Sequence, residues 1–400
     1  MSKIVVTGLG IISALGMGAD DTYARLLEGR TGIGRMRFLQ SKHTDLPVGE
    51  VPLSDEELRE ILNVRKESSI TRTSLLGASA LREALLTANL LPRNRDLKMA
   101  LISGTTVGGM EKSEQYYYDF LHTRERDEYI ALHDCGACTD MIGQANPYGF
   151  DMMTTISTAC SSAANAIILG ANMLKIHRTD IAIVGGTECL SKFHLNGFNS
   201  LMILDHEPCR PFDKNRNGLN LGEGAAYLVM EREETARARG ISPLCELSGY
   251  GNRCDAFHQT ASSPEGEGAY LSMVDALSMA GLKPSDIDYV NAHGTGTPNN
   301  DESEGHAMMR LFGDSVPPVS STKSYTGHTT SASGGVEAVI SILALIRGFI
   351  PANLNFSEKI DSLNFTPITE VQTDVPLCHV LTNSFGFGGN DSSCIFSKIS

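Results

Sequence analysis

Apolar residues in this chain form two recurring patterns, short strand-like runs and longer stretches that are apolar on nearly every helical face. Residues 1–10 are a β-branched run that enters a glycine turn, and residues 181–186 form a second strand-like run. Residues 163–174 and 334–345 are rich in small and apolar side chains, which is typical of buried helices. Strands that alternate with buried helices predict an α/β architecture.

The chain also contains an internal repeat. Residues 81–105 and 273–295 both predict a helix, a loop, a strand and a turn, and Pro92 matches Pro284 in this register. A deletion of two residues separates the two copies. We therefore expect a duplicated fold, in which two sheets enclose the central helices and further helices lie outside.

The two halves are expected to meet near residue 240. Residues 231–240 are highly charged and end in a glycine, which predicts a surface helix rather than a flexible linker. We therefore divide the chain into residues 1–240 and 241–400, joined as one body.

Composition excludes several classes of protein. The 400 residues have a formal net charge of −14, which argues against a general nucleic-acid binder. The nine cysteines form no framework spacing, and Cys135 and Cys138 have no second pair or histidine cluster nearby, so neither disulfides nor a metal is expected. The N-terminus does not look like a secretion signal, and the apolar residues 336–350 are interrupted by charges. We expect a cytoplasmic protein without a membrane span.

Cys160 is the first candidate for chemistry. It lies between an apolar strand-like run and a helix of small residues, so the start of that helix would direct backbone N–H groups and a positive dipole end at the sulfur. This arrangement favours a thiolate nucleophile. By itself such a residue is more often a buried, unreactive cysteine that packs as a small apolar side chain.

Three loops in the second half add further candidates. His293 lies between a strand end and a Gly/Thr loop, and Lys323 precedes His328 and a later Glu337. Phe385 and Phe387 alternate with glycines. Taken singly, these could be a structural histidine, a buried ion pair and a tight turn with two core aromatics.

Taken together, the motifs resemble the β-ketoacyl-[acyl carrier protein] synthases, closest to the type II elongating enzymes. The motifs follow in the order Thr-Ala-Cys at 158–160, His-Gly-Thr-x-Thr-Pro at 293–298, Lys-x-x-x-Gly-His at 323–328 and Asn-Ser-Phe-Gly-Phe-Gly-Gly at 383–389. The resemblance extends over essentially the whole chain. It implies the thiolase-like fold, a duplicated five-layered α/β/α/β/α body that normally dimerises through sheet edges.

The resemblance also implies an activity. It is the decarboxylative condensation of an acyl thioester with malonyl-acyl carrier protein, which releases carbon dioxide and gives a 3-oxoacyl chain in fatty acid elongation. Cys160 would be acylated, and its N–H with that of Phe385 would form the oxyanion hole. His293 and His328 would stabilise the enolate, and Lys323, held by Glu337, would orient His328.

Further residues receive roles from the same resemblance. Thr295 and Thr297 would bind the phosphopantetheine arm, which is supplied by the carrier protein, so that no resident cofactor or metal is implied. Phe385 would gate the acyl pocket, with the glycines around Phe387 allowing movement. Basic side chains that could dock the acidic carrier are Arg65, Lys66, Arg72, Arg210, Lys214 and Arg216.

Several alternatives stay open. Ser161-Ser162, Asn217 to Leu219 and Asn390-Asp391 depart from the usual elongating pattern, so a specialised polyene or polyketide pathway is one alternative. A cysteine–histidine hydrolase would also use an activated thiolate, although it gives no reason for two histidines and a lysine. A third alternative is a non-catalytic chain-length-factor-like subunit, against which the presence of Cys160 argues. The partner of the chain would be a second copy or such a paralogue.

Overall fold

A computed structural model describes residues 2–90, 96–123, 125–145, 147 and 149–399. Pro92, which the repeat aligned with Pro284, lies outside these residues. The strands are β1 (Ile4–Ser13), β2 (Gly16–Met17), β3 (Met99–Gly104), β4 (Met152–Ile156), β5 (Ile181–Glu188), β6 (Gly224–Arg232), β7 (Cys245–Cys254), β8 (Tyr289–Asn291), β9 (Val319–Ser320), β10 (Phe349–Ile350), β11 (Gln372–Thr373), β12 (His379–Gly386) and β13 (Asn390–Ser397).

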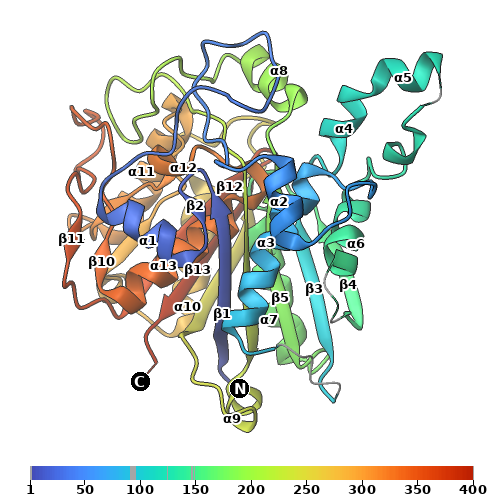
Figure 1. The fold of residues 1–400 in the computed structure, drawn as a ribbon. Helices are drawn as coiled ribbons and strands as arrows, with labels where there is room; N and C mark the ends of the chain where they lie inside the picture. The colour runs from blue at the N-terminus through green and yellow to red at the C-terminus, as the bar shows by residue number, and fades with distance from the viewer. Residues whose placement is uncertain (1, 91–95, 124, 146, 148, 400) are drawn as a thin grey trace.

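The helices connect and cover these strands (Figure 1). They are α1 (Ala19–Leu27), α2 (Asp55–Leu62), α3 (Arg72–Thr87), α4 (Met110–Gln115), α5 (Tyr117–His122), α6 (Cys135–Ala145), α7 (Ser162–Lys175), α8 (Lys192–Ser200), α9 (Glu233–Ala238), α10 (Glu267–Ala280), α11 (Pro298–Phe312), α12 (Lys323–Thr326) and α13 (Ser333–Arg347). Short 3-10 turns are η1 (Asp127–Tyr129), η2 (Pro284–Asp286) and η3 (Thr330–Ala332).

The strands pair continuously in the order β4-β3-β5-β6-β1-β7-β13-β12-β8-β9, with β2 beside β1. The five strands from β4 to β1 come from the first half of the chain and the five from β7 to β9 come from the second. Strands β3 and β5 are buried along their whole length, because helices cover both of their faces. The two halves join where β1 pairs with β7.

The layers match the duplicated five-layered α/β/α/β/α fold predicted from the sequence. Helix α3 packs on β1, β5 and β6, and α10 packs on β7 and β13, so these two helices form the outer layers. Helices α7 and α13 pack against each other and contact strands of both halves, which places them in the central layer. In the repeat, α3 and β3 therefore correspond to α10 and β8.

Small residues allow the two central helices to approach closely. A Cβ atom at Gly334 of α13 would lie only 2.9 Å from the backbone nitrogen of Ala164 in α7. The contact joins the two helices whose N-terminal ends adjoin Cys160 and His328. Among the described residues, the helical segment Thr330–Arg347 is long and apolar enough to cross a membrane, and 89% of it is buried as the core of this layer.

Two further features bear on the predictions. The sequence placed His293 at the end of a strand. Strand β8 ends at Asn291, so His293 lies two residues beyond that end. The division at residue 240 stays a prediction. The paired strands β1 and β7 form one continuous sheet across the two halves, so the sheet itself shows no boundary.

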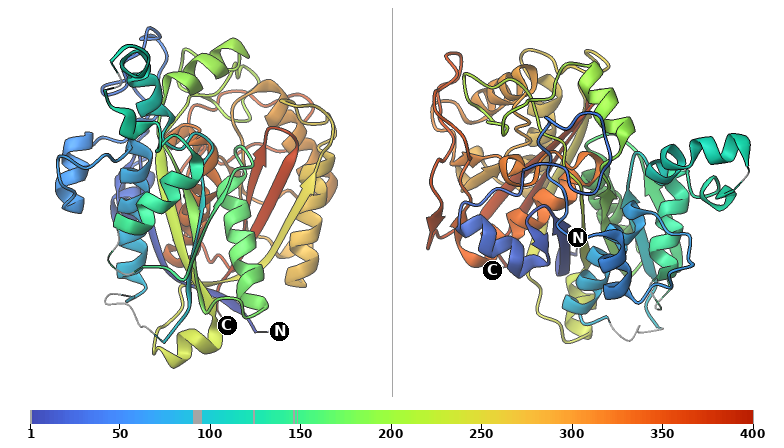
Figure 2. Two further views of the ribbon diagram at one scale, coloured as in Figure 1. Left: turned by 90° about the vertical axis from the view of Figure 1, so that its right-hand side faces the viewer. Right: turned by 45° about the horizontal axis from the view of Figure 1, so that its top comes forward.

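Helices α4 and α5 extend away from this body, as the right-hand view of Figure 2 shows.

Candidate active site

Cys160 lies at a strained turn between β4 and α7. Ala159 has a φ of 51°, in the left-handed region that a residue with a side chain rarely adopts. The Ser162 hydroxyl stabilises this turn, since it accepts from the Thr158 N–H at 2.9 Å and donates to the Ala159 carbonyl at 2.6 Å. The turn places Cys160 two residues before Ser162, the first residue of α7, with 5% of Cys160 exposed.

Two histidines from the second half of the chain lie beside this sulfur. The Nε2 atom of His328 lies 3.1 Å from the Sγ atom of Cys160. The His293 ring is nearly perpendicular to the His328 ring, with 5.3 Å between their centroids. Backbone hydrogen bonds to Asn220 and Gly222 fix His328, which ties the two halves together at the site.

Lys323 and Glu337 form a buried ion pair behind the histidines. The Lys323 ammonium lies 3.2 Å from Nδ1 of His293 and donates to the His293 carbonyl at 2.6 Å. Because an ammonium group can only donate, Nδ1 of His293 accepts and its ring proton is on Nε2. The sequence assigned Lys323 to His328 instead. The structure corrects this, because the short helix α12 directs the lysine toward the loop after β8.

The nearest polar side chain to the other nitrogen of His328 is a serine. The Ser333 hydroxyl lies 3.5 Å from Nδ1 of His328 and 3.4 Å from Oε1 of Glu337. A hydroxyl can rotate and either donate or accept. His328 is therefore less constrained in its tautomer than His293.

Burial controls the protonation of the site. Desolvation, with a further contribution from Lys323, lowers the pKa of both His293 and His328 well below the usual value, so both rings are neutral at pH 7. Burial also raises the pKa of Cys160 to about 11, although Lys323 and backbone N–H groups act in the opposite direction. Desolvation thus opposes the predicted thiolate at the unloaded site, whereas Lys323 and the backbone N–H groups favour it.

The loop of residues 385–389, here called the gate loop, covers the other side of the sulfur. A backbone N–H that faces Cys160 belongs to Phe387, just past the end of β12. Phe385 lies within β12, pairs with Asp391 and packs its ring 5.7 Å from that of His293. We therefore replace Phe385 by Phe387 as the second oxyanion-hole residue.

A cavity of about 370 Å³, here called the cysteine cavity, opens from these residues. Its lining combines Cys160 and both histidines with Thr295 and Thr297, whose hydroxyls lie 2.8 Å apart. The two phenylalanines of the gate loop also line it. The structure thus gathers the predicted nucleophile, histidines, threonines and gate around one space.

Comparison with known proteins agrees with this constellation. Residues 1–236 match the family model of the β-ketoacyl synthase N-terminal domain, and residues 244–357 match that of the C-terminal domain. The chain belongs to the β-ketoacyl synthase family.

The relatives of this family member cover its full length. The 3-oxoacyl-[acyl-carrier-protein] synthase 2 of Coxiella burnetii is 32% identical over 99% of both chains. The protein of the same name from Synechocystis is 32% identical over 99% of this chain and 98% of the relative.

Solved structures give the same picture. The chain resembles the ishigamide ketosynthase/chain length factor, with a TM-score of 0.91 and 29% identity over all of both chains. A β-ketoacyl synthase from Burkholderia phymatum matches with a TM-score of 0.85 and 29% identity, again over all of both chains.

The structure adds one site residue to this synthase that sequence reasoning missed. Glu304 of α11 is buried and accepts from the backbone N–H groups of His293 and Gly294, at 2.9 and 2.8 Å. The Asn383 amide donates to the same carboxylate at 3.0 Å. Glu304 thereby fixes the histidine loop against β12. Its only sequence signal is an acidic residue within a helix, which does not distinguish a buried carboxylate from a solvated one.

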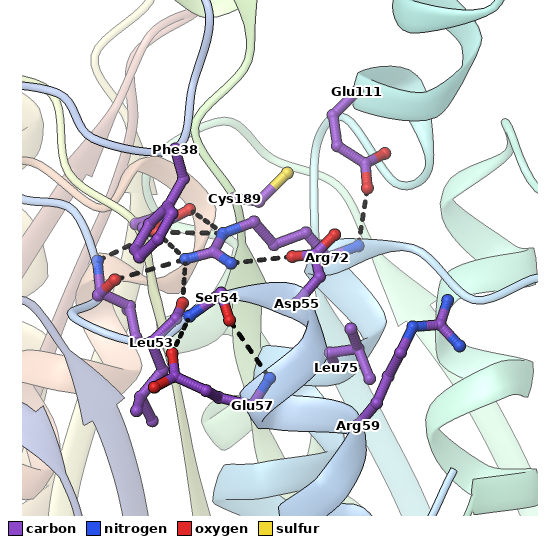
Figure 3. Close-up of polar contacts among 12 residues, drawn as sticks. Phe38, Leu53, Ser54, Asp55, Glu57, Arg59, Arg72, Leu75, Glu111 and Cys189 are labelled. Atoms are coloured by element: carbon purple, nitrogen blue, oxygen red, sulfur yellow. Dashed lines mark hydrogen bonds and ion pairs between the residues drawn. The ribbon is translucent and has the colours of Figure 1, made fainter. Parts of the chain in front are cut away.

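Two of the six predicted docking residues are buried, and a third is paired. The Arg72 guanidinium donates to Glu223, Asp55 and the Leu53 carbonyl, and the Arg72 backbone N–H donates to Glu111 (Figure 3). Arg216, whose side chain is 6% exposed, donates to the carbonyls of Thr297 and Pro298. Lys214 is exposed but forms ion pairs with Glu358 and Asp361.

The prediction that Arg72 and Arg216 dock a carrier is therefore wrong. Their charges stabilise internal loops instead, since a buried guanidinium must be paired. Arg65 and Lys66 are exposed, and Arg210 is half-buried with an Nε atom that has no partner among the described residues.

Proposed function

We propose that this chain condenses an acyl thioester with malonyl-acyl carrier protein, releasing carbon dioxide and forming 3-oxoacyl-acyl carrier protein in fatty acid elongation. The observation that supports this most strongly is the contact between Cys160 and His328, at 3.1 Å, beside a second neutral imidazole. Relatives named 3-oxoacyl-[acyl-carrier-protein] synthase 2, at 32% identity over the full chain, support the same reaction.

In the first step, Cys160 takes the acyl chain from its carrier. As Sγ attacks the thioester carbon, the thiol proton passes to the neutral Nε2 of His328, which lies 3.1 Å away. The bond to the carrier's sulfur breaks, and the leaving thiolate takes that proton. A thiol with a pKa of about 11 needs such a base, because little thiolate exists at pH 7.

In the second step, malonyl thioester loses its carboxylate. The carbon–carbon bond breaks, carbon dioxide leaves, and negative charge develops on the thioester oxygen. The Nε2–H of His293, fixed by the Lys323 contact at Nδ1, donates to that oxygen. His328 donates beside it from Nε2 once its single ring proton has moved there from Nδ1, where the Ser333 hydroxyl can either donate or accept. Neutral imidazoles suit this role because their N–H groups stabilise the developing charge more than the ground state.

In the third step, the enolate carbon attacks the acyl carbon on Cys160. Charge moves to the acyl oxygen, where the N–H groups of Cys160 and Phe387 stabilise it. The carbon–sulfur bond then breaks, the cysteine regains a proton from solvent, and a chain longer by two carbons leaves on the carrier. Thr295 and Thr297 would bind the phosphopantetheine arm, which is part of the substrate, and the chain needs no resident cofactor or metal.

A specialised polyketide or polyene pathway is the second candidate. A ketosynthase from Xenorhabdus doucetiae, solved in complex with its chain length factor, matches all of this chain with a TM-score of 0.85 and 30% identity. This likeness supports pairing with such a paralogue, and a cytoplasmic homodimer stays the expectation for the elongating enzyme. Arg65 and Lys66 stay candidates for carrier docking because they are exposed.

Mass spectrometry of the intact protein with a panel of acyl carriers tests the proposal. The native chain should gain an acyl mass on Cys160 and then extend it with malonyl carrier, whereas Cys160→Ala should gain none. His293→Ala should load but not extend, because it lacks one enolate donor. Product formation by Cys160→Ala would instead indicate a non-catalytic subunit, and free acid without carbon dioxide would indicate a hydrolase.

A further inference from the structure

The turn that ends α8 forms part of the wall of the cysteine cavity. Phe198, Met202 and Ile203 line this cavity, and Leu201 lies between them in sequence. We call these four residues the apolar rim. Leu201 is 42% exposed and Met202 is 87% exposed, so the rim continues from the cavity onto the outer surface.

The backbone of this turn explains how Met202 is exposed. Met202 donates its N–H to the Asn199 carbonyl at 3.0 Å and Ile203 donates to the Phe198 carbonyl at 3.5 Å, which is the Schellman pattern that ends a helix. Met202 occupies its left-handed position, with a φ of 56°. Glycine is usual there because it has no Cβ.

Met202 is therefore unfavourable in two independent ways, in its backbone conformation and in its exposed apolar side chain. Such a combination in a folded chain indicates a functional requirement at that position. Phe387 of the gate loop stacks on Phe198, with ring centroids 5.8 Å apart, so the rim also adjoins the gate.

The charges around the opening are few. No lysine, arginine, aspartate or glutamate is among the described residues that line the cysteine cavity. Of the exposed basic candidates, Lys66 lines a separate cavity of about 1000 Å³, and Lys214 is neutralised by Glu358 and Asp361. The described lining of the opening is thus uncharged, in a chain whose net charge is −14.

We propose that the apolar rim docks the acyl carrier protein through apolar contacts, with Met202 and Leu201 packed against an apolar surface of the carrier. The occupant follows from continuity, because the rim lines the same cavity as Cys160 and extends from it onto the outer surface. The inference rests on the proposed function and adds the mode of partner recognition: contact area, rather than charge steering, determines affinity.

Met202→Gly is the most informative variant. It removes the side chain and also relieves the left-handed backbone, so its melting temperature should equal or exceed that of the native chain. Its apparent KM for acyl carrier should rise about tenfold, the loss typical of an interface anchor. Its KM for a small acyl-pantetheine thioester, which has no protein surface, should change less than about twofold. The separate variant Met202→Leu, which keeps an apolar side chain of similar volume, should use the carrier as the native chain does.

The matched control is Ile176→Ser. Ile176 is 73% exposed and lies at the far end of α7 from Cys160, so both substrates should be used as by the native chain. Raising salt to about 0.5 M should alter the KM for the carrier by less than about threefold, because apolar contacts are not screened.

Two results would overturn the docking proposal. One is an equal KM change for carrier and small thioester, which would make Met202 a contact of the substrate arm. The other is a steep salt dependence, or a gain from Met202→Lys, which would indicate recognition by charge. Failure of the proposed function is distinct, since the native chain would then load neither substrate on Cys160.

Discussion

Asp391 is a buried carboxyl group at the start of β13, in the segment that follows the gate loop. It is 3% exposed, and burial together with the neighbouring carboxylates of Asp255 and Glu304 raises its pKa to about 8. Both Asp391 and Asp255 lie against Gly268. The charged Arg253 on the adjacent strand pairs with Asp275 instead, and no ion pair among the described residues involves Asp391 or Asp255.

The raised pKa predicts a pH-dependent stability. The folded chain retains the Asp391 proton up to about pH 8, whereas an unfolded aspartate loses it near pH 4, so stability falls as the pH rises through this window. Asp391→Asn keeps the shape and removes the titration. Thermal unfolding should show that the variant gains stability at pH 8 relative to the native chain and gains less at pH 5.

The control for this prediction is Asp140→Asn, which changes an exposed aspartate of α6. It should alter the melting temperature equally at both pH values. If Asp391→Asn has the same pH dependence as the native chain, the carboxyl does not carry its proton at neutral pH.

At the residue scale, the order of the motifs and the family resemblance that they carry identified the chemistry but not its contacts. Cys160, His293 and His328 follow distinctive neighbours, so their assembly could be predicted. The partner of Lys323 could not, because it depends on the direction in which α12 turns the side chain. The burial of Arg72 could not either, since its partners Asp55 and Glu223 are distant in sequence.

At the scale of elements, the contact between β3 and α7 determines where the nucleophile lies. Gly104 ends β3, and a Cβ atom there would lie 2.7 Å from the Ala163 nitrogen and 2.8 Å from the Ser162 carbonyl carbon. These are backbone atoms at the start of the helix that follows Cys160, so they cannot move without the helix.

Gly104→Ala should therefore displace the N-terminal end of α7. We expect a loss of about 1–3 kcal/mol of stability, the usual effect of overpacking, and slower acyl loading of Cys160. Denaturant unfolding and the rate of loading measure the two effects. Gly136→Ala is the control, because no atom lies within 4 Å of the added Cβ in α6, and native loading is expected. Native loading by Gly104→Ala would contradict this account.

Elements were more predictable than their contacts. The buried helices α7 and α13 and the repeated helix and strand units follow from composition and periodicity, which are local properties. The Schellman turn after α8 could not be predicted from the sequence, because Met202 occupies a position where glycine is the usual signal. The second oxyanion-hole residue was predicted as Phe385 and is Phe387 for a similar reason, since the position where β12 ends depends on its pairing with β13.

At the scale of the whole molecule, one edge of the sheet and the α4–α5 projection stay uncovered. Edge strand β4 is only partly buried, with Met153 38% exposed. On α5, Tyr118 is 73% exposed and Leu121 is 58% exposed. Free strand edges and apolar projections of this size are sites of protein association.

We expect a second copy to cover both features. Sedimentation equilibrium should give a dimer for the native chain, and Leu121→Glu, which places a charge in the interface, should weaken it by about tenfold or more in Kd. Ile176→Glu, on an exposed apolar residue away from this edge, should stay dimeric. A native monomer at micromolar concentration would contradict the expectation and favour pairing with a paralogue.

The central claim is that Cys160, His293 and His328 carry out a decarboxylative condensation. A single turnover of acyl-loaded protein with malonyl carrier labelled at its free carboxyl carbon tests it most directly. We predict one labelled carbon dioxide for each 3-oxoacyl chain formed, with loss of the acyl mass from Cys160 in the same step. Label retained in the product, or acyl released as free acid without labelled carbon dioxide, would contradict the account.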